Sequence, residues 1–160
     1  MTILKVLTSA LIIVGAAACT AATANESIVD LIASGQMDKV KALTKKGVSI
    51  DTLSNDQTGL MKVAEDGDKT TTEQLLKLGA DVNKTNSKNE TAVWFATYGG
   101  HEDLALALLD KGAKADQVNK DTKECLLHAA TKSQLTKLTA RLKKLSPQCL
   151  SVKNIDGQTP

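Results

Sequence analysis

The residues with the most direct chemical potential are a cysteine and a histidine near the C-terminal end of the sequence. Cys125 and His128 are three residues apart, so on one helix both side chains can lie on the same face. A thiol beside an imidazole can act as a nucleophilic pair or supply two metal ligands. Only Cys149 and the distant His101 could join them, and neither forms a second closely spaced pair. An enzyme or a metal site is therefore a remote alternative, and a buried neutral His128 is the simpler interpretation.

Other catalytic motifs are absent from the sequence. It contains no G-x-S-x-G, no glycine-rich phosphate loop and no H-E-x-x-H. The acidic pairs Glu65-Asp66 and Glu102-Asp103 are adjacent, so on a helix their carboxylates point apart and cannot flank one substrate bond. We expect these pairs to lie on solvated faces. The sequence thus predicts a non-enzymatic protein with no catalytic residue, no cofactor and no metal.

The composition predicts a core of small aliphatic contacts and excludes a broad electrostatic partner. The chain has 160 residues and only three aromatic ones, Trp94, Phe95 and Tyr98. A formal net charge of +2 does not suit a protein that wraps nucleic acid. A group of basic residues near the C-terminal end fits either a solvated helix face or an anionic partner. These residues are Lys132, Lys137, Arg141, Lys143 and Lys144.

The first 24 residues are typical of an export signal. Lys5 precedes an apolar run of 13 residues, at positions 6–18, which is too short to span a membrane. The sequence Ala22-Thr23-Ala24 fits a signal peptidase site that would release a chain starting at Asn25. Alternatively, residues 16–19 resemble a bacterial lipobox with Cys19 as the lipidated residue, or the segment is not cleaved. No second hydrophobic run follows, so we expect no membrane span.

Behind this leader the sequence repeats every 32 to 33 residues. Three successive units carry two glycines twelve residues apart, with apolar residues at helical spacing between them. The second glycine suits the position just past a helix, where a positive φ costs glycine little. The pairs are Gly35 and Gly47, Gly67 and Gly79, and Gly100 and Gly112. Each unit therefore predicts a helix, a turn, a second helix, a glycine stop and a polar loop.

These units resemble the ankyrin repeat, whose signature is T-P-L-H-x-A with a period of about 33 residues. The matching residues include the GADVN run at 79–83, Gly100-His101 between helices, and the DGQTP run at 156–160. The resemblance covers residues 26–160 and implies an all-α solenoid of helix-turn-helix units joined by hairpin-like loops. The expected repeats are 26–51, 54–83, 86–116 and 119–150, with a truncated fifth repeat from 154. We expect the natural chain to continue with at least one more repeat.

The resemblance also implies where a partner binds. Ankyrin arrays bind proteins through the hairpin tips and the inner face of the first helices. Tyr98 is the best anchor on that surface, because tyrosine buries a large flat area at low rotamer cost. Trp94 is expected to be half exposed beside it, and Phe95 to lie in the core. The remaining surface comprises Asn55, Gln57, Glu65, Asp66, Ser87, Lys88, Glu90, Gly99, Lys120, Asp121, Lys123, Thr131 and Lys132.

In a repeat of this kind Cys125 opens the first helix and Cys149 follows the antiparallel second helix, so the two can be neighbours. Export would place them in an oxidising compartment, where disulfides persist. We therefore predict a Cys125–Cys149 disulfide, with two unrelated buried thiols as the alternative. His101 follows a glycine in the turn between helices, where its imidazole is expected to satisfy backbone groups.

The sequence as a whole predicts an exported protein-protein interaction scaffold of the bacterial envelope. It is expected to be periplasmic or secreted, or anchored through lipid at Cys19, and to be monomeric. Its partner is a protein of unknown identity. The alternative function is that of a secreted effector or an immunity-type protein that neutralises a toxin.

Overall fold

The structure is a computed structural model and describes residues 27–160. The predicted leader, residues 1–24 with Cys19, lies outside the described residues. Within them the chain forms eight α-helices and one 3-10 helix, with no extended strand, so the predicted all-α class is confirmed. The elements are α1 (Ile28–Ala33), α2 (Met37–Lys45), α3 (Gly59–Glu65), α4 (Lys69–Lys77), α5 (Ala92–Tyr98), α6 (Glu102–Asp110), α7 (Leu126–Lys132), α8 (Thr136–Leu145) and η1 (Pro147–Ser151).

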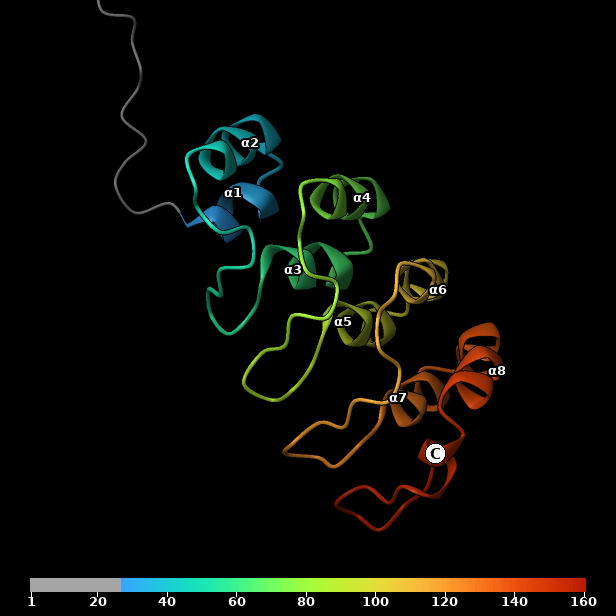
Figure 1. The fold of residues 1–160 in the computed structure, drawn as a ribbon. Coiled ribbons are helices and arrows are strands. Elements are labelled where there is room, and N and C mark those ends of the chain that lie inside the picture. The colour runs from blue at the N-terminus through green and yellow to red at the C-terminus, as the bar shows by residue number, and fades with distance from the viewer. Residues whose placement is uncertain (1–26) are drawn as a thin grey trace, which may run out of the picture.

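The helices form antiparallel pairs that stack side by side (Figure 1). The first helices, α1, α3, α5 and α7, make one row, and each packs against the next. The second helices, α2, α4, α6 and α8, make a second row that covers the first. The long loops between pairs all project to the same side, beyond the first row.

The ends of the helices follow from local sequence. The Ser27 hydroxyl accepts a hydrogen bond from the Asp30 amide at 3.2 Å, and the Thr58 hydroxyl accepts one from the Met61 amide at 3.2 Å. These side chains satisfy amides that have no partner within the first turn of a helix. Past the second helices, Gly79 and Gly112 both have φ of 92°, a conformation that is strained for residues with a Cβ. The predicted glycine stops are confirmed.

The core consists mainly of small aliphatic side chains, as the composition predicts. Val40, Leu75, Leu108 and Leu142, one from each second helix, are all at most 1% exposed. Adjacent repeats approach so closely that a Cβ added to Gly59 in α3 would lie 2.2 Å from Cδ1 of Ile32 in α1. Packing between neighbouring pairs is therefore what excludes water from the apolar faces.

Polar side chains tie each repeat to the next. The Asp51 carboxylate accepts a hydrogen bond from the Asp81 amide at 3.0 Å, and the Asn83 side-chain oxygen accepts one from the Lys114 amide at 2.8 Å. Asp51 and Asn83 occupy equivalent positions in successive repeats, and each accepts a hydrogen bond from a backbone amide of the following repeat.

Glu102 corrects one expectation from the sequence. It was assigned to a solvated face, but its Oε1 accepts hydrogen bonds from the Lys137 and Leu138 amides at 2.7 and 3.0 Å. These amides belong to the first turn of α8, so Glu102 of α6 caps a helix in the next repeat. Asp103 beside it is exposed, as expected for a solvated face.

Candidate partner-binding face

One surface of the stack combines exposed side chains from several repeats. We call it the inner face and define it as the exposed side of α3, α5 and α7 together with the loops that precede these helices. The loops project beyond the first row of helices, so loops and helices together form a surface that the second row does not cover (Figure 1). Its helical residues are Lys62, Glu65, Asp66, Phe95, Tyr98, Thr131 and Lys132.

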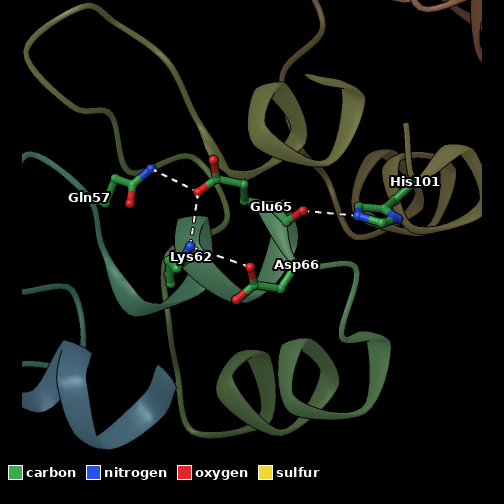
Figure 2. Close-up of polar contacts among 5 residues, drawn as sticks. All are labelled: Gln57, Lys62, Glu65, Asp66 and His101. Carbon is green, nitrogen blue, oxygen red and sulfur yellow. Dashed lines mark hydrogen bonds and ion pairs between the residues drawn. The ribbon is translucent and has the colours of Figure 1, made fainter. Parts of the chain in front are cut away.

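On α3 the inner face carries a network of charged and amide side chains (Figure 2). The Glu65 Oε2 accepts hydrogen bonds from Gln57 Nε2 at 3.2 Å and Lys62 Nζ at 3.4 Å. Lys62 Nζ also lies 3.3 Å from Asp66 Oδ1, and these two carboxylates, Asp66 first, raise the pKa of Lys62. The Lys62 ammonium group stays protonated at neutral pH, so its positive charge lies beside both Glu65 and Asp66.

His101 joins this part of α3 to the next repeat. Its Nε2 lies 2.9 Å from the Glu65 backbone oxygen, as Figure 2 shows. The imidazole also sits where a Cβ on Gly67 or Gly99 would meet it at less than 3.0 Å. The expectation that His101 satisfies a backbone group is confirmed, and the group belongs to the preceding repeat. The role of His101 is therefore to hold neighbouring repeats together.

Hydrogen bonds between loops fix the outer part of the inner face. The Asp56 carboxylate accepts hydrogen bonds from the Ser87 hydroxyl and amide, which lower the pKa of Asp56. Further along, the Glu90 carboxylate accepts hydrogen bonds from Asn86 Nδ2 at 2.9 Å and Asn119 Nδ2 at 2.7 Å. Ser87 and Glu90 were predicted as contact residues, and the structure shows that both also brace one loop against its neighbour.

A hollow of about 300 Å³ lies between the second and third repeats. Phe95 of α5 is its aromatic side chain, and Gln57, Lys88 and Glu90 are among its polar ones. Phe95 was expected in the core, but its side chain is only partly buried. The alignment of the repeats could have predicted this partial exposure, because Phe95 aligns with Lys62, a charged residue that favours contact with solvent.

The position of Trp94 also differs from the prediction. It was expected to be half exposed and to take part in binding, but it is 0% exposed and belongs to the core. In the repeat register Trp94 aligns with Met61 and His128, which are both buried. Trp94 and Phe95 therefore exchange their expected places: Phe95 borders the surface hollow, and Trp94 packs inside.

Tyr98 lies on the surface where the sequence predicts it, with 44% of its area exposed. Its ring packs against Trp94 with a centroid distance of 5.6 Å, and its hydroxyl donates a hydrogen bond to Glu124 Oε2 at 3.1 Å. Burial of the phenol first, and the Glu124 charge second, raise the pKa of Tyr98. The phenol is therefore neutral, and Trp94 and Glu124 hold the ring in place. Because the ring is already ordered, binding a partner to it costs less conformational entropy.

The other predicted surface residues lie along the loops and at the end of α7. Thr131 is tied to its own helix, because its hydroxyl donates to the Leu127 backbone oxygen at 2.8 Å. The Lys120 amide donates to the Lys88 backbone oxygen at 3.0 Å, so the loop before α7 runs alongside the loop before α5 there. Exposed residues of this group are Asn55, Lys88, Gly99, Lys120, Asp121, Lys123, Thr131 and Lys132.

Cys125 and His128 do meet, but inside the protein. The Cys125 Sγ lies 3.2 Å from His128 Nδ1, and the two residues are 0% and 6% exposed. Cys149 lies beside them, with its backbone oxygen 3.8 Å from the Cys125 Sγ. Both cysteines are free thiols in the structure, and the disulfide between them stays a prediction. Across residues 27–160, no three His, Cys, Asp or Glu side chains converge as metal ligands.

Stacked pairs of short antiparallel helices, joined by loops that project to one side, define a helical repeat protein. The chain belongs to the ankyrin repeat family: a family model described as ankyrin repeats, in three copies, matches residues 28–121. The α7–α8 pair lies beyond this match and continues the same stack. None of the helices in residues 27–160 is long and apolar enough to cross a membrane.

Two relatives illustrate the extent of the similarity. The chain is 38% identical over 55 residues to the Notch-regulated ankyrin repeat-containing protein of Xenopus tropicalis, a segment that covers 34% of this chain and 48% of the relative. It is 36% identical over 55 residues to Notch-regulated ankyrin repeat-containing protein A of Danio rerio, covering 34% and 49%. The chain thus spans about half the length of the curated relatives it matches.

The assignment of Trp94 to the core and Tyr98 to the surface predicts a large difference in stability between two substitutions in one helix. Trp94→Ala removes a fully buried indole and is expected to cost about 3–5 kcal/mol in the free energy of unfolding. Tyr98→Ala truncates an exposed ring and is expected to cost less than ~1 kcal/mol. Urea denaturation followed by circular dichroism measures both. Similar losses for the two variants would contradict the assignment.

Proposed function

We propose that this protein is a non-enzymatic binding scaffold that holds a partner protein against its inner face. Membership of the ankyrin repeat family indicates a protein-protein interaction scaffold. The finer proposal, which concerns this chain, is that the partner contacts Tyr98, the hollow beside Phe95 and the loop tips around them. Trp94 is left out of this surface because it is buried.

The observation that carries the proposal is the arrangement of Phe95 and Tyr98. Two of the chain's three aromatic residues reach the same surface, from one helix in the middle of the stack. Aromatic side chains dominate binding energy when they are rigid and surrounded by polar groups that exclude water. The Tyr98 ring rests on Trp94, and Glu124 holds its hydroxyl, so the anchor is in place before a partner arrives.

Polar groups around the anchor favour one orientation of the partner. Glu90 lines the hollow with Phe95, Glu124 accepts a hydrogen bond from Tyr98, and Glu65 holds Gln57, which lines the same hollow. Each of these carboxylates already accepts a hydrogen bond from within the protein. When a partner covers these carboxylates, they keep their hydrogen bonds within the protein. The desolvation cost of binding is therefore lower. The scaffold thus provides a preformed patch with an aromatic centre and a polar rim.

The site of action belongs to the same proposal. The apolar run at 6–18 and the small residues that follow it support export across a bacterial inner membrane. We place the scaffold in the envelope, as a periplasmic or secreted monomer or as a lipoprotein held at Cys19. A disulfide between Cys125 and Cys149 would be compatible with such a compartment.

Tyr98→Ala is expected to weaken binding of the partner by about 30-fold or more, as for truncation of an aromatic hot spot. The partner is first captured from a periplasmic extract with the full-length protein, and its affinity for each variant is then measured by calorimetry. Leu145→Ala is the matched control, because Leu145 in the second row has a similar exposure of 48%. Equal affinities of Tyr98→Ala and the unmodified protein would overturn the assignment of the inner face.

Export predicts a defined N-terminus. After expression with its own leader, the protein should appear in the periplasmic fraction with an intact mass that starts at Asn25, because signal peptidase cleaves after small residues. A lipidated N-terminus at Cys19 would support the lipoprotein form of the same proposal. Recovery of the chain in the cytoplasm with residues 1–24 still attached would contradict export.

A further inference from the structure

The interior of the last repeat brings two thiols and an imidazole together at a place that the binding face does not use. Cys125 lies at the N-terminal end of α7, and Cys149 lies in η1. They are 24 residues apart in the chain, and their exposed fractions are 0% and 1%. The Cys125 Sγ is 3.8 Å from the Cys149 backbone oxygen. The Cys125 thiol at the start of α7 therefore lies against the Cys149 residue of η1.

The chemical state of Cys149 reflects this proximity. Burial, followed by the hydrogen bond and charge of the Cys125 side chain, raises the pKa of Cys149 above its ordinary value. Cys149 is therefore a protonated thiol at neutral pH, and it attacks a disulfide only once its proton has left.

His128 holds Cys125 in place. Its Nδ1 lies 3.2 Å from the Cys125 amide nitrogen and 3.2 Å from the Cys125 Sγ. An amide nitrogen always donates, so Nδ1 is an acceptor and its lone pair is used by the Cys125 amide. The second ring nitrogen, Nε2, is 3.1 Å from the Gln158 backbone oxygen and donates to it. The imidazole thus joins the Cys125 end of α7 to the final loop.

We propose that Cys125 and Cys149 are a redox pair that closes to a disulfide by exchange with a small-molecule disulfide. This inference does not rest on the identity of the partner or on the inner face. Its substrate class is a low-molecular-weight disulfide such as oxidised glutathione.

The exchange balances in two steps. Cys125 gives up its proton to the solvent, and the thiolate attacks one sulfur of the oxidant, whose S–S bond breaks; the departing sulfur takes up a proton and leaves as a thiol. Cys149 then loses its proton and attacks the Cys125 sulfur, and the second thiol leaves as the Cys125–Cys149 bond forms. Overall, two protein thiols are oxidised and one disulfide of the oxidant is reduced to two thiols.

The bond would hold the last repeat closed. The closed loop contains all of α7 and α8, and it joins the beginning of α7 to the segment that leads into the final loop. The Gln158 oxygen in that loop is hydrogen-bonded to His128, so the same cluster positions the loop after the fourth repeat. Because both sulfurs are buried, exchange requires η1 to open briefly, and its rate reports that opening.

The test uses the full chain with Cys19→Ser, which leaves Cys125 and Cys149 as its only cysteines. The protein is equilibrated with mixtures of reduced and oxidised glutathione, denatured, alkylated with iodoacetamide and analysed by mass spectrometry. We expect both thiols to be alkylated under reducing conditions, and an unalkylated chain with linked Cys125 and Cys149 peptides under oxidising ones. Two alkylated thiols at every ratio, or a glutathione adduct that never converts to the linked form, would overturn the pairing.

Stability gives a second readout. The oxidised chain should melt about 5–10 °C above the reduced chain, because closing a loop of this length restricts the unfolded state. Cys125→Thr is the matched control, since Thr58 and Thr91 occupy the same position in other repeats. That variant should fold and melt at one temperature in both buffers. A difference that persists in Cys125→Thr would show that the bond is not its source.

Discussion

No helix pair of this protein can bury its apolar surface alone, and the whole structure depends on that constraint. The first helices are six or seven residues long, and each is covered by its own partner and by the neighbouring pairs. A helix so short is unstable in isolation, so its stability must come from tertiary packing. The stack is therefore held by nearest-neighbour contacts, and the hydrogen bonds of Asp51, Asn83 and Glu102 fix the register between repeats.

The packing between helix pairs does not restrict the side chains of the inner face. Side chains that face the neighbouring pairs are mostly apolar, and the second row of helices covers the other side of the first. The exposed positions of α3, α5 and α7 carry no such restriction. Glu65, Tyr98 and Lys132 occupy the same register position in three successive repeats and differ in charge and shape. Variation at a fixed position of a rigid stack is how such a surface acquires a particular partner.

The period and the all-α class could be predicted from the sequence, because they depend on spacing that the repeats share. The glycine stops could be predicted for the first three repeats, which carry Gly47, Gly79 and Gly112, whereas α8 ends at Ser146 without a glycine. The exposure of single aromatic residues was predicted less well. Trp94 and Phe95 are adjacent, and the prediction placed Trp94 half exposed beside Tyr98 and Phe95 in the core. Comparison within the chain would have corrected this, since Trp94 aligns with the buried Met61 and Phe95 aligns with Lys62. The capping of α8 by Glu102 joins residues 35 and 36 positions apart, and no local pattern could reveal it.

We propose that the partner binds the inner face and not the second row of helices. Hydrogen-deuterium exchange of the free and partner-bound protein distinguishes the two surfaces, because it reports every segment at once. If the inner face binds, exchange slows in the loops before α3, α5 and α7 and in the last turn of α5, and stays unchanged in α4, α6 and α8. Protection confined to those second helices, with the loops and α5 unaffected, would show that the partner binds the second row instead.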